Sequence, residues 1–215
     1  MKYKNIIFDL DGTITDSKPG IVKGVQYALR CYGIDEQDQD KLTSFVGPPL
    51  YKSFMNYLDC SEEEAKEVVE CYREYYAETG LYENALYEGI DALLYQLKEA
   101  GYRIVLASSK PRLYVKRVLS HFRVMRYFDI VEGSELDGTN TDKAELLAHM
   151  LEKWNLKAED CVMVGDRKHD IMGAKANGMD SIAVGYGYGS EDELSKAGPT
   201  YFFSTIEELK NFFLN

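Results

Sequence analysis

Two aspartates near the start of the chain stand at the end of an apolar run. The segment NIIFDL contains Asp9, and Asp11, Gly12 and Thr13 follow directly after it. Residues i and i+2 of a strand point to the same side, so a strand over residues 5–10 would bring the two carboxylates together. A fold tolerates such repulsion when a cation or a proton lies between the groups. The spacing therefore predicts a site that holds positive charge where this strand ends.

A second pair of aspartates lies far along the chain, in the segment CVMVGDRKHD. Asp166 ends another apolar run, and Asp170 follows shortly after it. Together with Asp9 and Asp11, these residues would form a cluster of hard oxygen ligands. Mg²⁺ prefers such ligands, whereas zinc sites are usually built from His and Cys. We therefore expect Asp9, Asp11, Asp166 and Asp170 to bind Mg²⁺.

Other residues are suited to hold an anion beside this cluster. Ser108 ends the apolar run YRIVLASS and is followed by Ser109, and Lys143 opens a predicted helix in NTDKAELL. The loop containing Gly12 and Thr13 would expose backbone N–H groups, and the dipole of a helix N-terminus also favours a negative ligand. A metal ion, a lysine, a hydroxyl and loop amides around two aspartates are typical of a phosphoryl-transfer site.

The opening pair of aspartates then has a chemical interpretation. Asp9 can attack phosphorus and form an aspartyl-phosphate. Asp11 can give a proton to the leaving oxygen and later take one from the water that hydrolyses the intermediate. Gly12 allows a sharp turn that brings backbone close to the phosphate. Asp9, Asp11, Ser108 and Lys143 are the predicted catalytic residues, and Gly12, Thr13, Ser108, Ser109 and Lys143 are the predicted phosphate-binding residues.

These groups come together only if the strands that carry them lie side by side. Short apolar strands alternate with helices along most of the chain, which predicts an α/β fold with a doubly wound parallel sheet. Ligands of such sheets bind at the carboxyl ends of the strands, where the candidate residues lie. The predicted strands cover residues 5–10, 102–109, 127–131, 161–166 and 181–185.

The segment between the first two strands has a different character. Residues 17–83 show only helical patterns, with glycine stops at Gly33 and Gly80 and a serine cap at Ser61. We expect this segment to be an inserted helical domain, and residues 1–16 with 84–215 to form the α/β core.

The bulk composition limits the partners. The 25 basic and 36 acidic residues give a formal net charge of −11, which disfavours nucleic acid. No apolar stretch reaches the roughly 18 residues of a membrane span, and the four cysteines form no C-x-x-C pair. We expect a cytoplasmic enzyme, monomeric or weakly homo-oligomeric, that acts on a small phosphorylated metabolite.

The four motifs, in this order, resemble those of the haloacid dehalogenase superfamily of phosphatases. They are FDLDGT at residues 8–13, the strand that ends in Ser108, Lys143, and GDRKHD at residues 165–170. The resemblance implies a Rossmann-like core, with Asp9 as the nucleophile and Asp11 as the general acid and base. It also implies Mg²⁺ held by Asp9, the backbone carbonyl of Asp11, and Asp166, with support from Asp170.

The helical insertion is similar to the small cap of the subgroup that includes phosphoglycolate phosphatases. FVGPPL, ENALYEGI and SSKP, which begin at residues 45, 83 and 108, are more similar to a branch described as 5′-nucleotidase-like. Many relatives have Asn where this chain has Ser109. The resemblance thus implies hydrolysis of a phosphate monoester such as 2-phosphoglycolate, a nucleoside 5′-monophosphate or a sugar phosphate.

Two alternatives remain open. A phosphomutase of the same family would share every core motif. A signalling module that accepts a phosphoryl group without turnover would also use an aspartate, Mg²⁺, a hydroxyl and a lysine, although Asp11 would speed loss of its phosphoryl group. A dehalogenase is disfavoured, because it has no use for Asp11 or the metal cluster. The glycine-rich segment GYGYG at residues 185–189 is expected to be a flexible rim.

Overall fold

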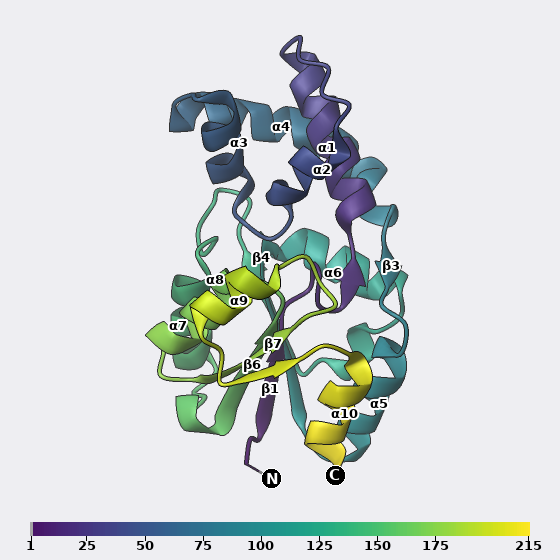
Figure 1. The fold of residues 1–215 in the computed structure, drawn as a ribbon, viewed down its shortest axis with the longest axis vertical. Helices are drawn as coiled ribbons and strands as arrows, with labels where there is room; N and C mark the ends of the chain where they lie inside the picture. The colour runs from purple at the N-terminus through teal and green to yellow at the C-terminus, as the bar shows by residue number, and fades with distance from the viewer. Residues whose placement is uncertain (1) are drawn as a thin grey trace.

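A six-stranded sheet forms the centre of the protein in the computed structural model, which describes residues 2–215 (Figure 1). The strand order is β5-β4-β1-β6-β7-β8, and all neighbouring strands run parallel. The chain therefore builds outward from β1 first to one edge and then to the other, which confirms the doubly wound parallel sheet. The strands are β1 (Asn5–Phe8), β4 (Arg103–Pro111), β5 (Ile130–Ser134), β6 (Cys161–Gly165), β7 (Asp180–Val184) and β8 (Tyr201–Phe203).

Helices cover both faces of this sheet, and the alternation of side chains explains why the strands are apolar throughout. Ile6 and Phe8 pack in one core cluster with leucines of α5 and α10, whereas Ile7 packs in another with leucines of α7. Successive residues of a strand point to opposite faces, so both sets must be apolar. The helices of this part are α5 (Ile90–Glu99), α6 (Arg112–His121), α7 (Lys143–Lys153), α8 (Lys168–Ala176), α9 (Glu191–Ala197) and α10 (Ile206–Leu214).

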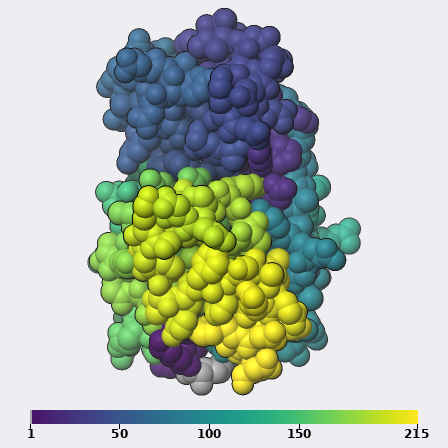
Figure 2. Space-filling model, in the orientation of Figure 1, coloured from purple at the N-terminus to yellow at the C-terminus, as the bar shows by residue number. Residues whose placement is uncertain are grey.

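A group of helices lies beyond the carboxyl ends of the strands, at the end of the molecule opposite both termini (Figures 1 and 2). The chain enters and leaves this group through a short antiparallel ribbon, in which β2 (Thr15–Asp16) pairs with β3 (Ala85–Leu86). The ribbon was not predicted, since two residues per strand carry no periodic pattern. The helices of the group are α1 (Lys18–Cys31), α2 (Gln39–Leu42), α3 (Leu50–Leu58) and α4 (Glu62–Glu78).

Three details of the strands differ from the sequence prediction. The first strand ends at Phe8, because the carbonyl of Leu10 accepts backbone hydrogen bonds from Ile14 and Thr15 and so begins a turn. The strand predicted over residues 127–131 lies at β5 instead, since residues 125–127 form a single helical turn. The edge strand β8 was missed, because its three residues are too short to show alternation.

Candidate active site

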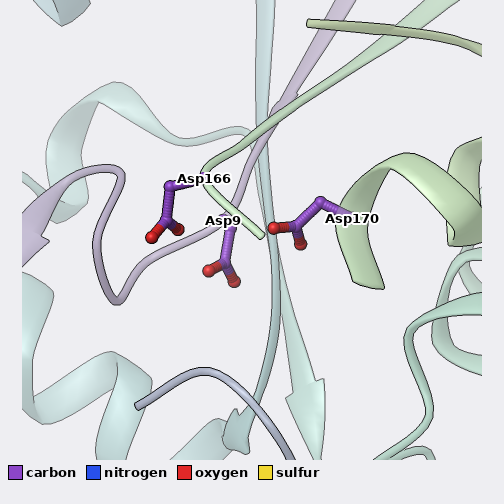
Figure 3. A group of neighbouring side chains, drawn as sticks. All are labelled: Asp9, Asp166 and Asp170. Atoms are coloured by element: carbon purple, nitrogen blue, oxygen red, sulfur yellow. The ribbon is translucent and has the colours of Figure 1, made fainter. Parts of the chain in front are cut away.

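Three carboxylates from separate segments converge where the sheet meets the helical group (Figure 3). Asp9 follows β1, Asp166 follows β6, and Asp170 lies in the first turn of α8. One oxygen atom from each carboxylate lies within 4.8 Å of the others, and all three side chains are buried. The structure thus brings three of the four predicted aspartates together from distant parts of the chain, and their role as metal ligands stays a prediction.

Lys143 lies against this cluster and neutralises part of its charge. Its Nζ atom lies 2.8 Å from Oδ1 of Asp9 and 2.8 Å from Oδ1 of Asp170, and it donates to the carbonyl oxygen of Ala107 at 2.8 Å. Burial alone would lower the pKa of the Lys143 ammonium, but Asp170 and Asp9 outweigh it and raise that pKa above its usual value. Lys143 is therefore a permanent cation in the site.

The carboxylates around Lys143 carry more negative charge than one ammonium can balance. Burial is the main reason that the pKa of Asp9 rises to about 6, and Asp170 and Asp11 add to the effect while Lys143 opposes it. Burial and then the charges of Asp170 and Asp9 raise the pKa of Asp166 well above its usual value. Buried carboxylates that repel one another with one lysine among them are a donor set that fits a divalent cation such as Mg²⁺.

The orientation of Asp166 is set by two segments of the chain. Thr13 donates its hydroxyl to Oδ1 at 3.2 Å, and the backbone N–H of Tyr188 donates to Oδ2 at 2.8 Å. Gly12 has a φ of +87°, and a Cβ atom there would lie 2.2 Å from Oδ2 of Asp166. Glycine is therefore required at this position both by the turn and by the approach of the carboxylate. The hydroxyl of Thr13 is thus engaged with Asp166, while its predicted contact with phosphate stays a prediction.

The segment at residues 185–189 was predicted to be a flexible rim, and this prediction is wrong. Its tyrosines are tied to the start of the chain: Tyr186 donates its hydroxyl to the carbonyl oxygen of Thr13 at 3.1 Å, and Tyr188 donates to Oδ1 of Asp16 at 2.6 Å. A Cβ atom on Gly187 would lie 2.3 Å from Cβ of Asp166. The glycines therefore allow close packing against a candidate metal ligand.

Asp11 is paired with a lysine of its own and lies outside the three-carboxylate cluster. Its Oδ1 atom lies 2.5 Å from Nζ of Lys110, and both side chains are nearly buried. The two aspartates of the opening motif were expected to face the same side of one strand, but the strand ends before both and each is paired with its own lysine. The side chain of Asp11 is not part of the three-carboxylate cluster. Its role as a ligand through the backbone carbonyl stays a prediction.

Ser108 and Ser109 lie within β4, which runs to Pro111 and so extends beyond the predicted end at residue 109. Ser108 is buried, and its Oγ accepts the backbone N–H of Lys110 at 3.3 Å. The carbonyl of Ser109 accepts the hydroxyl of Ser134 at 2.8 Å, which braces the extension of β4 against β5. Ser108 thus lies at the carboxyl end of the strand beside β1, as predicted.

Sequence reasoning missed three residues that contact the site. Lys110 pairs with Asp11, and the backbone N–H of Tyr188 donates to Asp166. The backbone N–H of Arg167 donates to Oδ2 of Asp170 at 3.1 Å, and its guanidinium donates to the carbonyl oxygen of Val46 in the helical group. Arg167 also donates from Nε to Glu193 at 2.8 Å. Each belongs to a segment that the sequence analysis quoted, but a sequence does not show which carboxylate or carbonyl a long side chain will meet.

A cavity of about 350 Å³ opens between the core and the helical group, next to Asp11. Three cations line it within residues 2–215, and each is already paired with a carboxylate: Lys66 with Glu62, Arg73 with Glu70, and Lys110 with Asp11. The rest of the lining is rich in rings and aliphatic groups, among them Phe45, Pro48, Pro49, Leu50, Tyr51, Val69, Tyr72, Tyr76 and Tyr114.

The comparison with protein families agrees with this geometry. A family profile described as haloacid dehalogenase-like hydrolase matches residues 6–184, which include every candidate site residue. The chain belongs to this family. The predicted superfamily, fold class and activity as a phosphoric monoester hydrolase are therefore confirmed.

Individual relatives carry three different names. A Pseudomonas aeruginosa protein named 5′-nucleotidase is 47% identical over 98% of this chain and 95% of its own length. A Mycobacterium tuberculosis protein named tyrosine-protein kinase PtkA is 39% identical over 95% of this chain and 70% of its own. A Colwellia psychrerythraea protein named phosphoglycolate phosphatase is 29% identical over 95% of this chain and 94% of its own.

A solved structure shows how closely the fold is shared. A predicted phosphatase from Clostridium acetobutylicum superposes with a TM-score of 0.97 at 43% identity, covering 100% of this chain and 99% of the other. In the described part of this chain, no helix combines the length and apolar character needed to cross a membrane.

Proposed function

We propose that this phosphatase depends on Mg²⁺ and hydrolyses a small phosphate monoester through an aspartyl-phosphate on Asp9. The observation that carries the proposal is the convergence of Asp9, Asp166 and Asp170 around Lys143 at the carboxyl ends of the strands. Asp9, Asp166 and Asp170 would hold the metal ion together with the backbone carbonyl of Asp11. The bound ion would neutralise charge on the phosphoryl group.

The chain's own residues would carry the covalent step. Asp9 attacks phosphorus while the bond to the leaving oxygen breaks, which yields an aspartyl-phosphate and the free alcohol. Lys143 and Ser108 would hold the phosphoryl oxygens, together with N–H groups of the loop at Gly12 and Thr13 and with Ser109. Positive charge that is fixed before the reaction lowers the barrier without later rearrangement.

Asp11 would transfer the protons of both steps. It gives a proton to the leaving oxygen in the first step. In the second step it takes a proton from the water that attacks the aspartyl-phosphate, which regenerates Asp9 and releases phosphate. Its place in the cavity lining, with Lys110 as its partner, supports this division of roles.

The cavity beside Asp11 supports an uncharged leaving group that carries a ring. Each of its three cations forms an ion pair with a carboxylate of the chain, so the carboxylate of a glycolate group would have to compete with these pairs. Tyrosines and prolines line the remaining wall, and rings of this kind stack on a planar base. We therefore rank a nucleoside 5′-monophosphate first among the expected substrates, a sugar phosphate second and 2-phosphoglycolate last. The name of the Pseudomonas relative agrees with this order.

The helices of residues 17–83 would act as an inserted cap on a core of residues 1–16 and 84–215. A cap excludes water from the site and selects the leaving group. The position of α3 and α4 over the cavity supports this division, since both contribute to its lining. We further propose a cytoplasmic enzyme, monomeric or weakly homo-oligomeric, with no nucleic-acid partner.

Turnover separates this function from its alternatives. A signalling module would be labelled once, whereas a phosphatase releases inorganic phosphate over many cycles. A phosphomutase, or a kinase as the name of the Mycobacterium relative suggests, would move the phosphoryl group to a second acceptor. Product analysis with a labelled phosphate ester distinguishes all of these outcomes.

The direct test is a panel of phosphate esters assayed for kcat/KM with and without Mg²⁺. The panel contains adenosine 5′-monophosphate, ribose 5-phosphate, 2-phosphoglycolate and 2,4-dinitrophenyl phosphate. We expect phosphate release that requires the metal and is fastest, among the alkyl esters, for the nucleotide. Equal rates after complete chelation would contradict the metal dependence, and a preference for 2-phosphoglycolate would contradict the substrate class.

A further inference from the structure

The ion pair of Lys110 and Asp11 lies outside the three-carboxylate cluster and lines the cavity between the core and the helical group. The pair is 2.5 Å long, its side chains are 7% and 8% exposed, and both residues line the cavity. We propose that Lys110 is a positioning residue that aims Asp11 at the leaving group of the substrate. This inference rests on the phosphatase function proposed above.

The pairing uses only one side of the Asp11 carboxylate. Oδ1 is bonded to Lys110, and Oδ2 has no hydrogen-bond partner among residues 2–215. Oδ2 is also not among the fully buried side-chain atoms that lack a partner, and Asp11 lines the cavity. Fixing one oxygen restricts rotation of the carboxylate and holds the other at a defined place. Lys110 thereby leaves one oxygen of Asp11 available to a ligand.

The position of Lys110 is linked to that of the phosphate site. Ser108 and Lys110 are alternate residues at the end of β4, and the Lys110 N–H donates to Oγ of Ser108 at 3.3 Å. Gly133 of β5 allows the close approach, since a Cβ atom there would lie 2.6 Å from the carbonyl oxygen of Lys110. The segment 108–110 would therefore position both the phosphoryl group, through Ser108, and the carboxylate of Asp11, through Lys110.

Lys110 also contacts the helical group above it. Its Nζ atom lies 5.2 Å from the centre of the Tyr76 ring in α4. A buried ammonium is stable only with compensating partners, and here they are the carboxylate of Asp11 and the face of this ring. The pair is thus enclosed between core and cap, where the leaving group of a bound ester would lie.

The proposed role has a consequence that a purely structural role lacks. When the bond from phosphorus to an alkyl oxygen breaks, the leaving oxygen takes its proton from Asp11, and Lys110 keeps all of its own protons. A 2,4-dinitrophenolate leaves as a stable anion and needs no proton. Loss of Lys110 should therefore slow alkyl esters much more than the dinitrophenyl ester.

The test compares Lys110→Gln with the wild type on the two kinds of ester. The alkyl ester is the one that the wild type hydrolyses fastest in the panel above. We expect kcat for this ester to fall by about 10²-fold or more, and kcat for 2,4-dinitrophenyl phosphate by less than about fivefold. Lys110→Arg keeps the charge and should recover part of the loss. The matched control is Lys98→Gln, which removes a 2.5 Å ion pair with Asp129 at the surface.

Equal losses on both esters, or no loss on either, would overturn the proposal. The double variant Lys110→Gln with Asp11→Asn provides a second criterion, since it should be no slower on the alkyl ester than Asp11→Asn alone. Losses that multiply would show that Lys110 does not act through Asp11. If Lys110→Gln fails to fold, the same comparison is made with Lys110→Arg: the loss in kcat on the alkyl ester relative to the loss on the dinitrophenyl ester. Failure of the proposed function would look different, because wild type would then release no phosphate or Asp9→Asn would retain activity.

Discussion

At the scale of single residues, the site is defined by which partner each aspartate has. Asp9 and Asp170 both form ion pairs with Lys143, whereas Asp11 forms an ion pair with Lys110. The sequence predicted that positive charge would separate the two carboxylates of the opening motif. It could not show that two lysines would supply that charge, because the partner of a long side chain depends on tertiary packing.

Asp9→Asn tests the assignment of the nucleophile. The variant keeps the shape of the side chain but loses the nucleophile, so hydrolysis of any ester in the panel should fall by more than about 10³-fold. The fold should persist, because the change removes one of several carboxylates that repel one another in a buried site. Phosphate release and urea unfolding measure the two effects. Near-normal turnover would exclude Asp9 as the nucleophile.

Gly12→Ala tests how closely the turn approaches Asp166. The added Cβ would lie 2.2 Å from Oδ2 of Asp166, at a φ of +87°. We expect a loss of about 1–3 kcal/mol in the free energy of unfolding and a clear loss of Mg²⁺ affinity. Gly33→Ala is the matched control, because Gly33 has a φ of +76° but no atom within 4 Å of an added Cβ. Unchanged Mg²⁺ affinity in Gly12→Ala would contradict a metal site at Asp166.

At the scale of secondary structure, the long elements could be predicted from the sequence and the shortest strands could not. The buried runs that became β1, β4 and β6 are apolar on both faces, so their place in a parallel sheet could be predicted. The β2–β3 ribbon and β8 contain two or three residues per strand and show no period. The segment at residues 185–189 was misread because glycines that allow close packing look the same in a sequence as glycines of a mobile loop.

The hydroxyl of Tyr188 connects residues 185–189 to the start of the helical group through two hydrogen bonds. It donates to Oδ1 of Asp16 at 2.6 Å and accepts the backbone N–H of Lys18 at 2.9 Å. Tyr188→Phe should lower the free energy of unfolding by about 1–3 kcal/mol, since both groups lose a partner. Mg²⁺ affinity should not change, because Asp166 is held by the backbone N–H of Tyr188.

The control for Tyr188→Phe is Tyr27→Phe, which removes an exposed hydrogen bond to Glu74. Its effect on the free energy of unfolding should stay within about 0.5 kcal/mol. Urea unfolding of the two variants gives the comparison. Equal, small effects would mean that the Tyr188 hydroxyl does not stabilise the junction of core and helical group.

At the scale of the whole molecule, the buried carboxylates link stability to pH and to metal. The pKa of Asp9 is raised from 3.8 to about 6, so the folded protein binds more protons than the unfolded chain between these values. Stability of the metal-free protein should therefore fall as the pH rises from about 4 to about 6, by about 2–3 kcal/mol from this group. The raised pKa of Asp166 acts in the same direction.

Mg²⁺ should reverse this trend, because it binds the deprotonated carboxylates. The rise in Tm caused by the metal should be larger at pH 7.5 than at pH 5. Thermal unfolding with Mg²⁺ and with a chelator, at both pH values, gives the four numbers needed. A rise of the same size at both pH values would show that the metal binds elsewhere.

The central claim is that Asp9, Asp166 and Asp170 share one divalent cation while Asp9 receives the phosphoryl group. A crystal structure of the protein with Mg²⁺ and beryllium fluoride, a mimic of a phosphoryl group on a carboxylate, tests it most directly. We predict beryllium bonded to Asp9, with Mg²⁺ between Asp9 and Asp166. Beryllium on Asp11, or Mg²⁺ away from these carboxylates, would contradict the account.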